Sequence, residues 1–211
     1  MNIIRVLLAD DHTLVRAGFC RLLESIPGIQ VVGEASDGRD ALEMIEAKSP
    51  DMVLMDIGMT GLNGLEATAR AKHDYPDVRV IILSMHADKE YVLRALRAGA
   101  SGYLTKSAAP ENLVTAVTKV ARGGRYVSET LADLLAADVG GQQVSAPHER
   151  LSDREFEVMC AIASGKTASE IAATMHLSVK TISTYRARLL EKMGMSSNAE
   201  LTHYAISNKL A

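Results

Sequence analysis

Short apolar runs alternate with helical patterns along the first 120 or so residues. The runs that predict strands are residues 3–9, 30–35, 52–56, 78–84 and 102–105. The stretches with helical spacing of apolar residues are 12–25, 38–48, about 64–72, 89–98 and 110–122. Five strand and helix units in this length predict an α/β fold with a doubly wound parallel sheet. A flavodoxin-like strand order of 2-1-3-4-5 is the expected topology.

The pattern changes after Arg122, where Gly123 and Gly124 break the last of these helices. Residues 128–138 predict a short linker helix, and residues 139–148, rich in Gly, Gln, Ser and Pro, predict a connector. Four short helices follow, at about 153–164, 168–176, 179–193 and 198–208. Capping boxes are expected at three of their starts, Ser152 with Glu155, Thr167 with Glu170 and Ser197 with Glu200. The expected domains are residues 1–122, a linker of residues 123–149, and an all-α domain of residues 150–211.

Composition narrows the class of protein. With 211 residues, 47% hydrophobic residues and a net charge of -3, the chain is expected to be soluble and globular. Cys20 and Cys160 lie far apart in helical patterns, which argues against a disulfide framework or a zinc site. No apolar run is long enough to span a bilayer and no signal peptide is evident, so we expect a cytoplasmic protein without a membrane partner.

Carboxylates stand where two of the predicted strands stop. Asp10 and Asp11 follow the first strand, and Asp56 ends the buried run of Val53, Leu54 and Met55. Parallel strands one and three would be neighbours, so the three carboxylates would meet at the carboxyl edge of the sheet. Such a cluster invites a hard divalent cation, for which Mg2+ is the expected choice, and Asp56 is a candidate nucleophile toward a phosphoryl group. The alternative is a strand-ending Asp that only caps the next turn.

Ser84 and Lys106 follow the fourth and fifth strands at the same edge. Lys106 would neutralise phosphoryl charge, and Ser84 would donate a hydrogen bond to a phosphoryl oxygen. Taken singly, Lys106 could be a strand-end cation paired with an acid, and Ser84 a helix N-cap. Matching chemistry at four strand ends favours the functional interpretation.

A short helix, a tight turn at residues 177–178 and a longer basic helix predict a helix-turn-helix. The longer helix, residues 179–193, would enter the DNA major groove. Between residues 176 and 195 the charged side chains are Lys180, Arg186, Arg188, Lys192 and the acid Glu191. The alternative is a basic but merely solvated helix face.

Residues 3–122 resemble the receiver domain of two-component response regulators, through Asp10-Asp11, the run D-I-G-M from Asp56, Ser84, and G-Y-L-T-K ending at Lys106. The resemblance implies that Asp56 is the phosphoacceptor and Lys106 the phosphate partner. It implies that Asp10, Asp11, Asp56 and the backbone carbonyl of Gly58 bind the metal. Ser84 and Tyr103 would be the switch pair. Without the resemblance, the alternative interpretation of Tyr103 is a half-buried aromatic residue on an edge strand.

Residues 150–211 resemble the four-helix DNA-binding domain of NarL/FixJ (LuxR-type) regulators. The resemblance is carried by L-S-D-R-E-F-E-V-M, S-E-I-A, S-V-K-T-I-S-T-Y-R and E-K-M-G. It implies that the last helix is a dimer surface. The implied DNA contacts are Lys180, Thr181, Ser183, Thr184 and Arg188.

Together these resemblances imply a transcription factor that is not a stand-alone enzyme. Phosphorylation of Asp56 by a sensor histidine kinase would control homodimer formation and binding to double-stranded DNA, with RNA polymerase as a further candidate partner. Thr60 stands where the receiver family usually has Pro. An alternative function is phosphorylation-independent DNA binding, with the receiver as an interaction module. A haloacid dehalogenase-like phosphatase would also use Asp56 and Thr60, but it needs a second Asp where this chain has Gly58.

Overall fold

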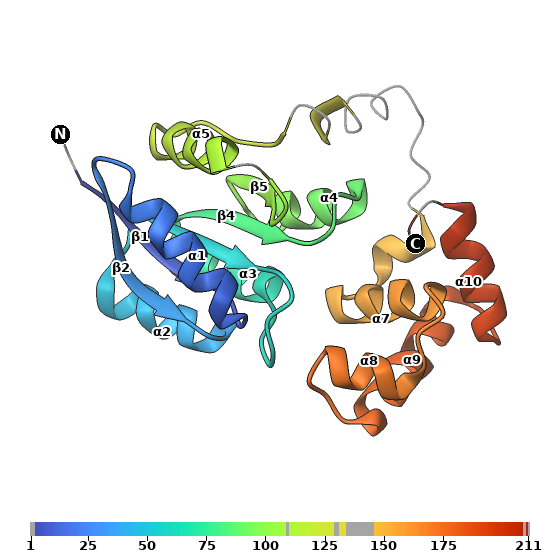
Figure 1. Cartoon of the computed structure of the whole chain (residues 1–211). Helices are drawn as coiled ribbons and strands as arrows, with labels where there is room; N and C mark the ends of the chain where they lie inside the picture. Colours follow the sequence, from blue (N-terminus) through green and yellow to red (C-terminus); the bar gives the residue numbers. More distant parts are fainter. Residues whose placement is uncertain (1–2, 109, 129–130, 134–145, 209, 211) are drawn as a thin grey trace. The chain divides into compact units, whose positions relative to one another are not determined.

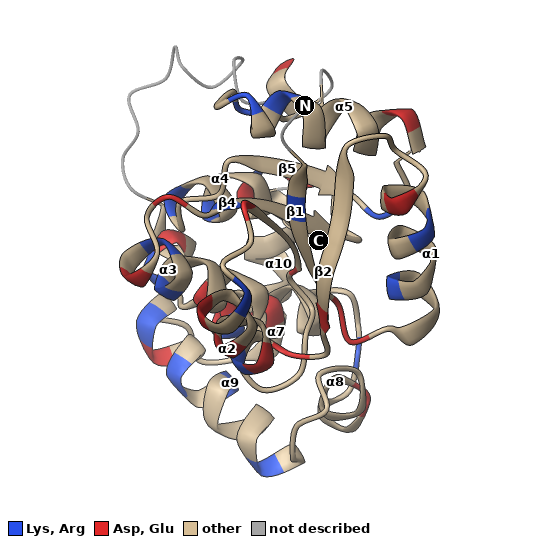
Figure 2. Ribbon diagram, turned by 90° about the vertical axis from the view of Figure 1, so that its left-hand side faces the viewer, with Lys and Arg blue, Asp and Glu red and all other residues tan. Residues whose placement is uncertain are grey.

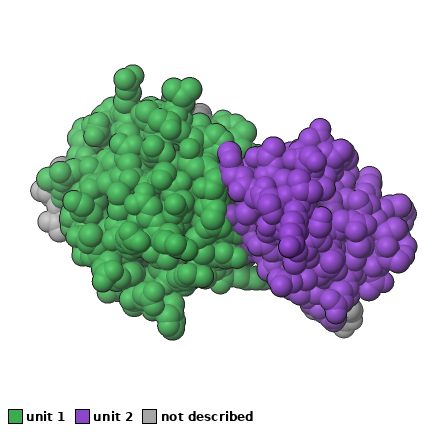
Figure 3. Space-filling model, turned by 90° about the horizontal axis from the view of Figure 1, so that it is seen from below, with its two compact units in different colours: residues 1–139 green, residues 140–211 purple. Residues whose placement is uncertain are grey.

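The computed structural model describes residues 3–108, 110–128, 131–133, 146–208 and 210. The chain divides into two compact units, Met1–Val139 and Gly140–Ala211 (Figure 3). The first unit contains the predicted sheet with its helices, and the second contains the four helices predicted for the C-terminal part of the chain.

Five parallel strands form the sheet of the first unit. They are β1 (Ile4–Ala9), β2 (Ile29–Ala35), β3 (Met52–Asp56), β4 (Arg79–Ser84) and β5 (Gly102–Thr105). Their order is β2-β1-β3-β4-β5, and every neighbouring pair is parallel. The predicted flavodoxin-like topology is therefore confirmed.

Helices cover both faces of this sheet (Figure 1). They are α1 (Thr13–Glu24), α2 (Gly38–Lys48), α3 (Gly64–Asp74), α4 (Lys89–Arg97) and α5 (Pro110–Ala121). Alternate residues of β1 face opposite sides, as strand geometry requires. Val6 and Leu8 share one core with Leu23 of α1 and Leu113 of α5. Leu7 points to the other face, where its side chain and Met44 of α2 both approach Gly33.

The chain stays attached to the sheet beyond α5. The Tyr103 N–H donates to the Tyr126 carbonyl at 2.8 Å, and the Tyr126 N–H donates to the Ser101 carbonyl at 3.0 Å. Tyr126 is only 8% exposed and belongs to the core of the first unit. Residues 123–126 thus pack on the sheet, although the sequence pattern assigned them to the linker. Most of the predicted connector and part of the predicted linker helix lie outside the described residues, but residues 131–133 are helical.

The second unit contains the four predicted helices and one additional turn. These elements are η1 (Pro147–Arg150), α7 (Asp153–Ala163), α8 (Ala168–Thr174), α9 (Val179–Met193) and α10 (Asn198–Ser207). The 3-10 turn η1 was not predicted. Helix α8 ends two residues earlier than predicted, and His176 beyond it adopts a left-handed backbone with φ of 51°.

Two of the three predicted capping boxes are present, at Ser152 with Glu155 and at Thr167 with Glu170. The third is wrong in detail. Ser197 caps α10, but the Glu200 carboxylate accepts from the backbone N–H of Ser196, at 3.0 Å, and not from the backbone N–H of Ser197. In the part of the chain that the structure describes, no helix combines the length and apolar character needed to cross a membrane.

Candidate functional site

Strand register brings two aspartates together at the carboxyl edge of the sheet. Ala9 of β1 pairs with Met55 of β3, so Asp10 and Asp56 follow side by side. Both carboxylates are buried, with Asp10 0% and Asp56 3% exposed. Lys106 lies just beyond β5, and its Nζ is 2.8 Å from Asp10 Oδ2 and 2.8 Å from Asp56 Oδ2. The structure thus places two predicted carboxylates and the predicted cation in one buried cluster.

The electrostatics of this cluster follow from burial and pairing. Burial raises the pKa of Asp56, and the charge of Lys106 and an N–H bond from Gly58 only partly offset that increase. Burial alone would lower the pKa of Lys106. The negative charges and hydrogen bonds of Asp56 and Asp10 outweigh the effect of burial, so the pKa of Lys106 is raised. A protonated lysine therefore faces both carboxylates.

The residues around Asp56 also fit a divalent cation. Ligand atoms of Asp10, Asp11, His12 and Asp56 all lie within 4.8 Å of one another. Among the described residues, the buried atoms Asp10 Oδ2, Asp11 Oδ1 and Asp56 Oδ2 accept no hydrogen bond, although Lys106 Nζ lies 2.8 Å from the first and third and His12 Nδ1 lies 2.7 Å from the second. Clustered carboxylate oxygens of this kind suit a hard ion such as Mg2+. The sequence pattern did not assign His12 to the site, because that residue was taken as the start of a helix.

The loop after β3 is held closed by a glycine that sequence reasoning did not single out. The Gly64 N–H donates to the Ile57 carbonyl at 3.1 Å. A Cβ on Gly64 would lie 1.9 Å from the carbonyl oxygen of Asp56. Asn63 is buried and caps α3 by accepting from the Glu66 N–H at 2.8 Å. The backbone of Asp56 is thus packed directly against the first residue of α3.

Ser84 and Tyr103 meet at the backbone of His86. The Ser84 Oγ accepts from the His86 N–H at 3.0 Å, and the Tyr103 hydroxyl donates to the His86 carbonyl at 2.7 Å. Tyr103 is 0% exposed, so the half-buried alternative is wrong. The His86 ring stacks on Tyr91 of α4, with centroids 4.3 Å apart. The Lys106 N–H also donates to the Ser84 carbonyl at 2.7 Å, which ties the ends of β4 and β5 together.

Helix α9 presents the predicted DNA-contact residues on its surface. Lys180, Ser183, Thr184 and Arg188 are exposed, and Thr181 is half-buried at the capped first turn. Lys180, Thr184 and Arg188 recur every four residues and so share a face. Figure 2 shows the basic positions along this helix.

Two other basic residues of α9 are engaged in contacts within the second unit. The Arg186 Nε donates to Asn198 Oδ1 at 2.6 Å, and the Lys192 Nζ lies 2.6 Å from Glu155 Oε2. Ile182 and Leu189 are buried on the opposite side of the helix. Arg186 and Lys192 therefore stabilise the second unit, whereas Lys180 and Arg188 lie on the exposed face of α9.

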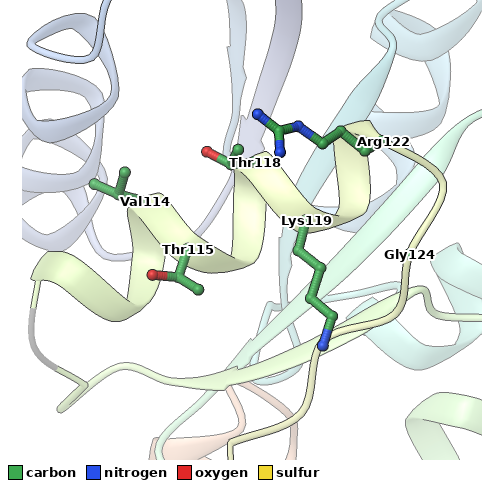
Figure 4. A pocket seen from close by; sticks show the side chains of 6 residues that line it. All are labelled: Val114, Thr115, Thr118, Lys119, Arg122 and Gly124. Atoms are coloured by element: carbon green, nitrogen blue, oxygen red, sulfur yellow. The ribbon is translucent and has the colours of Figure 1, made fainter.

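A hollow on the surface of the first unit lies on α5 and does not include the carboxylate cluster. The hollow is lined by Val114, Thr115, Thr118, Lys119, Arg122 and Gly124 (Figure 4). Lys119 and Arg122 extend in different directions from the helix, so their charges do not converge on one ligand. None of the predicted site residues lines this hollow.

Comparison with known families matches both units. The response regulator receiver domain model matches residues 6–118, and the luxR family model of bacterial regulatory proteins matches residues 149–205. The chain belongs to the NarL/FixJ response regulators. Members of this family are transcription regulators and not classical enzymes, so the stand-alone phosphatase alternative is wrong.

Similar response regulators cover from 64% to 98% of this chain. Response regulator UvrY of Escherichia coli O6:H1 (strain CFT073) is 42% identical over 208 residues, which are 98% of this chain and 95% of UvrY. Response regulator GacA of Pseudomonas aeruginosa is 40% identical over 204 residues, 96% of this chain and 95% of GacA. A structure of the Salmonella typhimurium response regulator RcsB has a TM-score of 0.69 at 28% identity and covers 98% of each chain. A LuxR-family response regulator from Aurantimonas sp. SI85-9A1 has a TM-score of 0.62 at 40% identity, covering 64% of this chain and 96% of that one.

Proposed function

We propose that a sensor histidine kinase phosphorylates this response regulator on Asp56, and that the phosphorylated form dimerises and binds double-stranded DNA to regulate transcription. The observation that carries the proposal is the buried Asp56 carboxylate, 2.8 Å from Lys106 and beside Asp10. A nucleophile of this kind needs a nearby cation and a water-poor site, since phosphoryl transfer depends chiefly on positioning and charge neutralisation.

The chemistry uses the side chains in named roles. An Asp56 carboxylate oxygen attacks the phosphorus of a phosphohistidine, the new O–P bond forms, and the P–N bond breaks with its electron pair returning to the imidazole. Lys106 exchanges its contact with the carboxylate for one with a phosphoryl oxygen. The protein would thereby take part in its own phosphoryl transfer and later hydrolysis without being a stand-alone enzyme.

Asp10, Asp11, Asp56 and the backbone carbonyl of Gly58 would hold Mg2+. The ion would supply positive charge that neutralises the incoming phosphoryl oxygens. The oxygen-rich donor set around Asp56 supports this assignment.

Ser84 and Tyr103 would act as the switch pair. Both are hydrogen-bonded to His86, so a Ser84 hydroxyl that turns toward a phosphoryl oxygen releases the His86 N–H. The loop before α4 would then rearrange around the buried Tyr103 ring. This change would alter the faces of the receiver that control its partners.

DNA binding would follow from the exposed side of α9. Lys180 and Arg188 would contact phosphates or guanine edges, and Thr181, Ser183 and Thr184 would add polar contacts. Helix α10 would form the dimer surface, so that two copies of α9 read half-sites roughly ten base pairs apart. A solved structure described as two RcsB dimers bound to two parallel DNAs, at a TM-score of 0.62 and 27% identity, supports DNA binding by a dimer. Because its partners would be chromosomal DNA and RNA polymerase, we place the protein in the cytoplasm.

The first test is intact-protein mass spectrometry after incubation with Mg2+ and acetyl phosphate. The wild type and an Asp74→Asn control, altered at an exposed carboxyl, should each gain one phosphoryl group, and Asp56→Asn should gain none. If the Asp56→Asn variant also gains a phosphoryl group, Asp56 is not the phosphoacceptor. If acetyl phosphate and candidate kinases both leave the wild type unlabelled while DNA binding is normal, the receiver is a phosphorylation-independent interaction module.

A further inference from the structure

His12 stands against the carboxylates of the proposed phosphoacceptor site. Its Nδ1 lies 2.7 Å from Asp11 Oδ1 and 3.4 Å from Asp10 Oδ1. Its backbone N–H donates to Asp10 Oδ1 at 2.8 Å, which fixes the residue next to the acidic pair. His12 is the N-cap residue of α1, but its side chain makes no capping hydrogen bond. The imidazole is therefore directed toward the aspartates and not toward the helix.

Asp10 separates His12 from the lysine of the site. Its Oδ2 atom is 2.8 Å from Lys106 Nζ, whereas its Oδ1 atom is the one nearest the His12 ring. A cation bound near Asp11 and Asp10 Oδ1 would thus have the imidazole on its own side of Asp10. Lys106 would face the other oxygen of that carboxylate.

The donor spacing suits a single ion. Neighbouring ligands of an octahedral ion with bonds of about 2.1 Å lie about 3 Å apart, and the two distances from the His12 Nδ1 fall on either side of that spacing. Carboxylate oxygens serve Mg2+ and Mn2+ alike, but imidazole nitrogen favours first-row transition ions.

We propose that His12 Nδ1 is a ligand of the divalent ion in this site, which therefore prefers first-row transition ions such as Mn2+ over Mg2+. The inference rests on the proposed function because it concerns the same metal site. The competing interpretation is that His12 only pairs with Asp11 as a surface cation, since its side chain is 67% exposed. The two interpretations differ in one observable, which is a bond from nitrogen to the metal.

Electron spin echo envelope modulation of Mn2+ bound to the full chain detects that bond directly. Spectra would be recorded at pH 8, because metal ligands must be deprotonated. The wild type should show coupling to an imidazole nitrogen, and His12→Gln should lose it. That variant keeps the backbone N–H that bonds Asp10. His73→Gln, which removes an exposed imidazole of α3, is the matched control and should keep the coupling.

Calorimetric titration gives the second measurement. His12→Ala should weaken Mn2+ binding by about tenfold or more, in the range found when metal-site residues are removed, and Mg2+ binding by much less. The proposal is overturned if Mn2+ does not bind, if its spectrum lacks nitrogen coupling, or if the coupling persists in His12→Gln. Acetyl phosphate labelling of Asp56 in the same variants tells the two proposals apart. Normal labelling without nitrogen coupling would contradict only the assignment of His12 as a ligand. Nitrogen coupling without labelling would contradict only the assignment of Asp56 as the phosphoacceptor.

Discussion

Gly64→Ala should destabilise the receiver unit and disturb Asp56 at the same time. The added Cβ would lie 1.9 Å from the Asp56 carbonyl oxygen and 2.7 Å from its carbonyl carbon. Both atoms belong to the backbone of β3, so no side chain can rotate to make room. Either α3 must move away from the sheet or β3 must shift at the residue that carries the nucleophile.

The size of that movement follows from the contact distances. Ordinary van der Waals contact begins near 3.4 Å, so the two backbones must separate by about 1.5 Å. Overpacking of well-packed sites costs about 1–3 kcal/mol and occasionally more, and a clash between two backbones belongs at the upper end. A misplacement of about 1 Å can also lower a rate by about 100-fold, so acetyl phosphate should label Asp56 far more slowly.

Urea unfolding and the labelling rate measure the two effects separately. Gly18→Ala is the matched control, because Gly18 lies in the interior of α1 and a Cβ there meets no atom within 4 Å. That control should raise stability by up to about 1 kcal/mol through better helix propensity. A Gly64→Ala protein with the wild-type urea midpoint and labelling rate would refute the packing argument.

Three further substitutions test other contacts. Burial raises the pKa of Glu155, but hydrogen bonds from Lys192 and a backbone N–H outweigh burial and hold that pKa below its usual range. The ionised carboxylate therefore stabilises the fold at neutral pH, and this stabilisation is lost as the pH falls through the lowered pKa. Glu155→Gln should therefore cost about 1–2 kcal/mol at pH 7 in urea unfolding, and a gap that does not shrink toward pH 3 would contradict this. Tyr103→Phe should cost about 1 kcal/mol, because it leaves the His86 carbonyl without its hydroxyl donor; an unchanged urea midpoint would show that this bond contributes nothing. Lys180→Ala should reduce the salt slope of DNA binding, measured by fluorescence anisotropy, by about one unit, and an unaltered slope would exclude a phosphate contact.

The elements and the carboxylate edge were predictable because their signals are local. Each strand is a run of apolar residues that stops where a polar residue must begin, and Asp10, Asp56 and Lys106 stand at those stops. The order of the strands then brings them together without further information. The DNA-contact candidates of α9 came from the resemblance to LuxR-type regulators, and they stay a prediction; the structure adds that Lys180, Thr184 and Arg188 share one exposed face of the helix.

The remaining features depend on contacts between distant segments. Nothing near Gly64 in the sequence indicates that its Cα will meet the Asp56 carbonyl, since that approach exists only after the loop has folded back. Tyr126 pairs with β5 through a single bridge, which is too short to give an alternating pattern. His12 looked like the first residue of a helix, and only its position against Asp11 distinguishes it.

The Tyr126 bridge also decides how β5 can meet other molecules. This strand has four residues and forms one edge of the sheet, and exposed edges invite pairing with strands of other chains. Here the outward Tyr103 N–H and Ser101 carbonyl are already hydrogen-bonded to Tyr126. A strand of a second copy therefore cannot pair with β5 at Ser101 and Tyr103 unless Tyr126 first leaves the sheet. The fold thereby closes a route to aggregation at the strand that carries Tyr103.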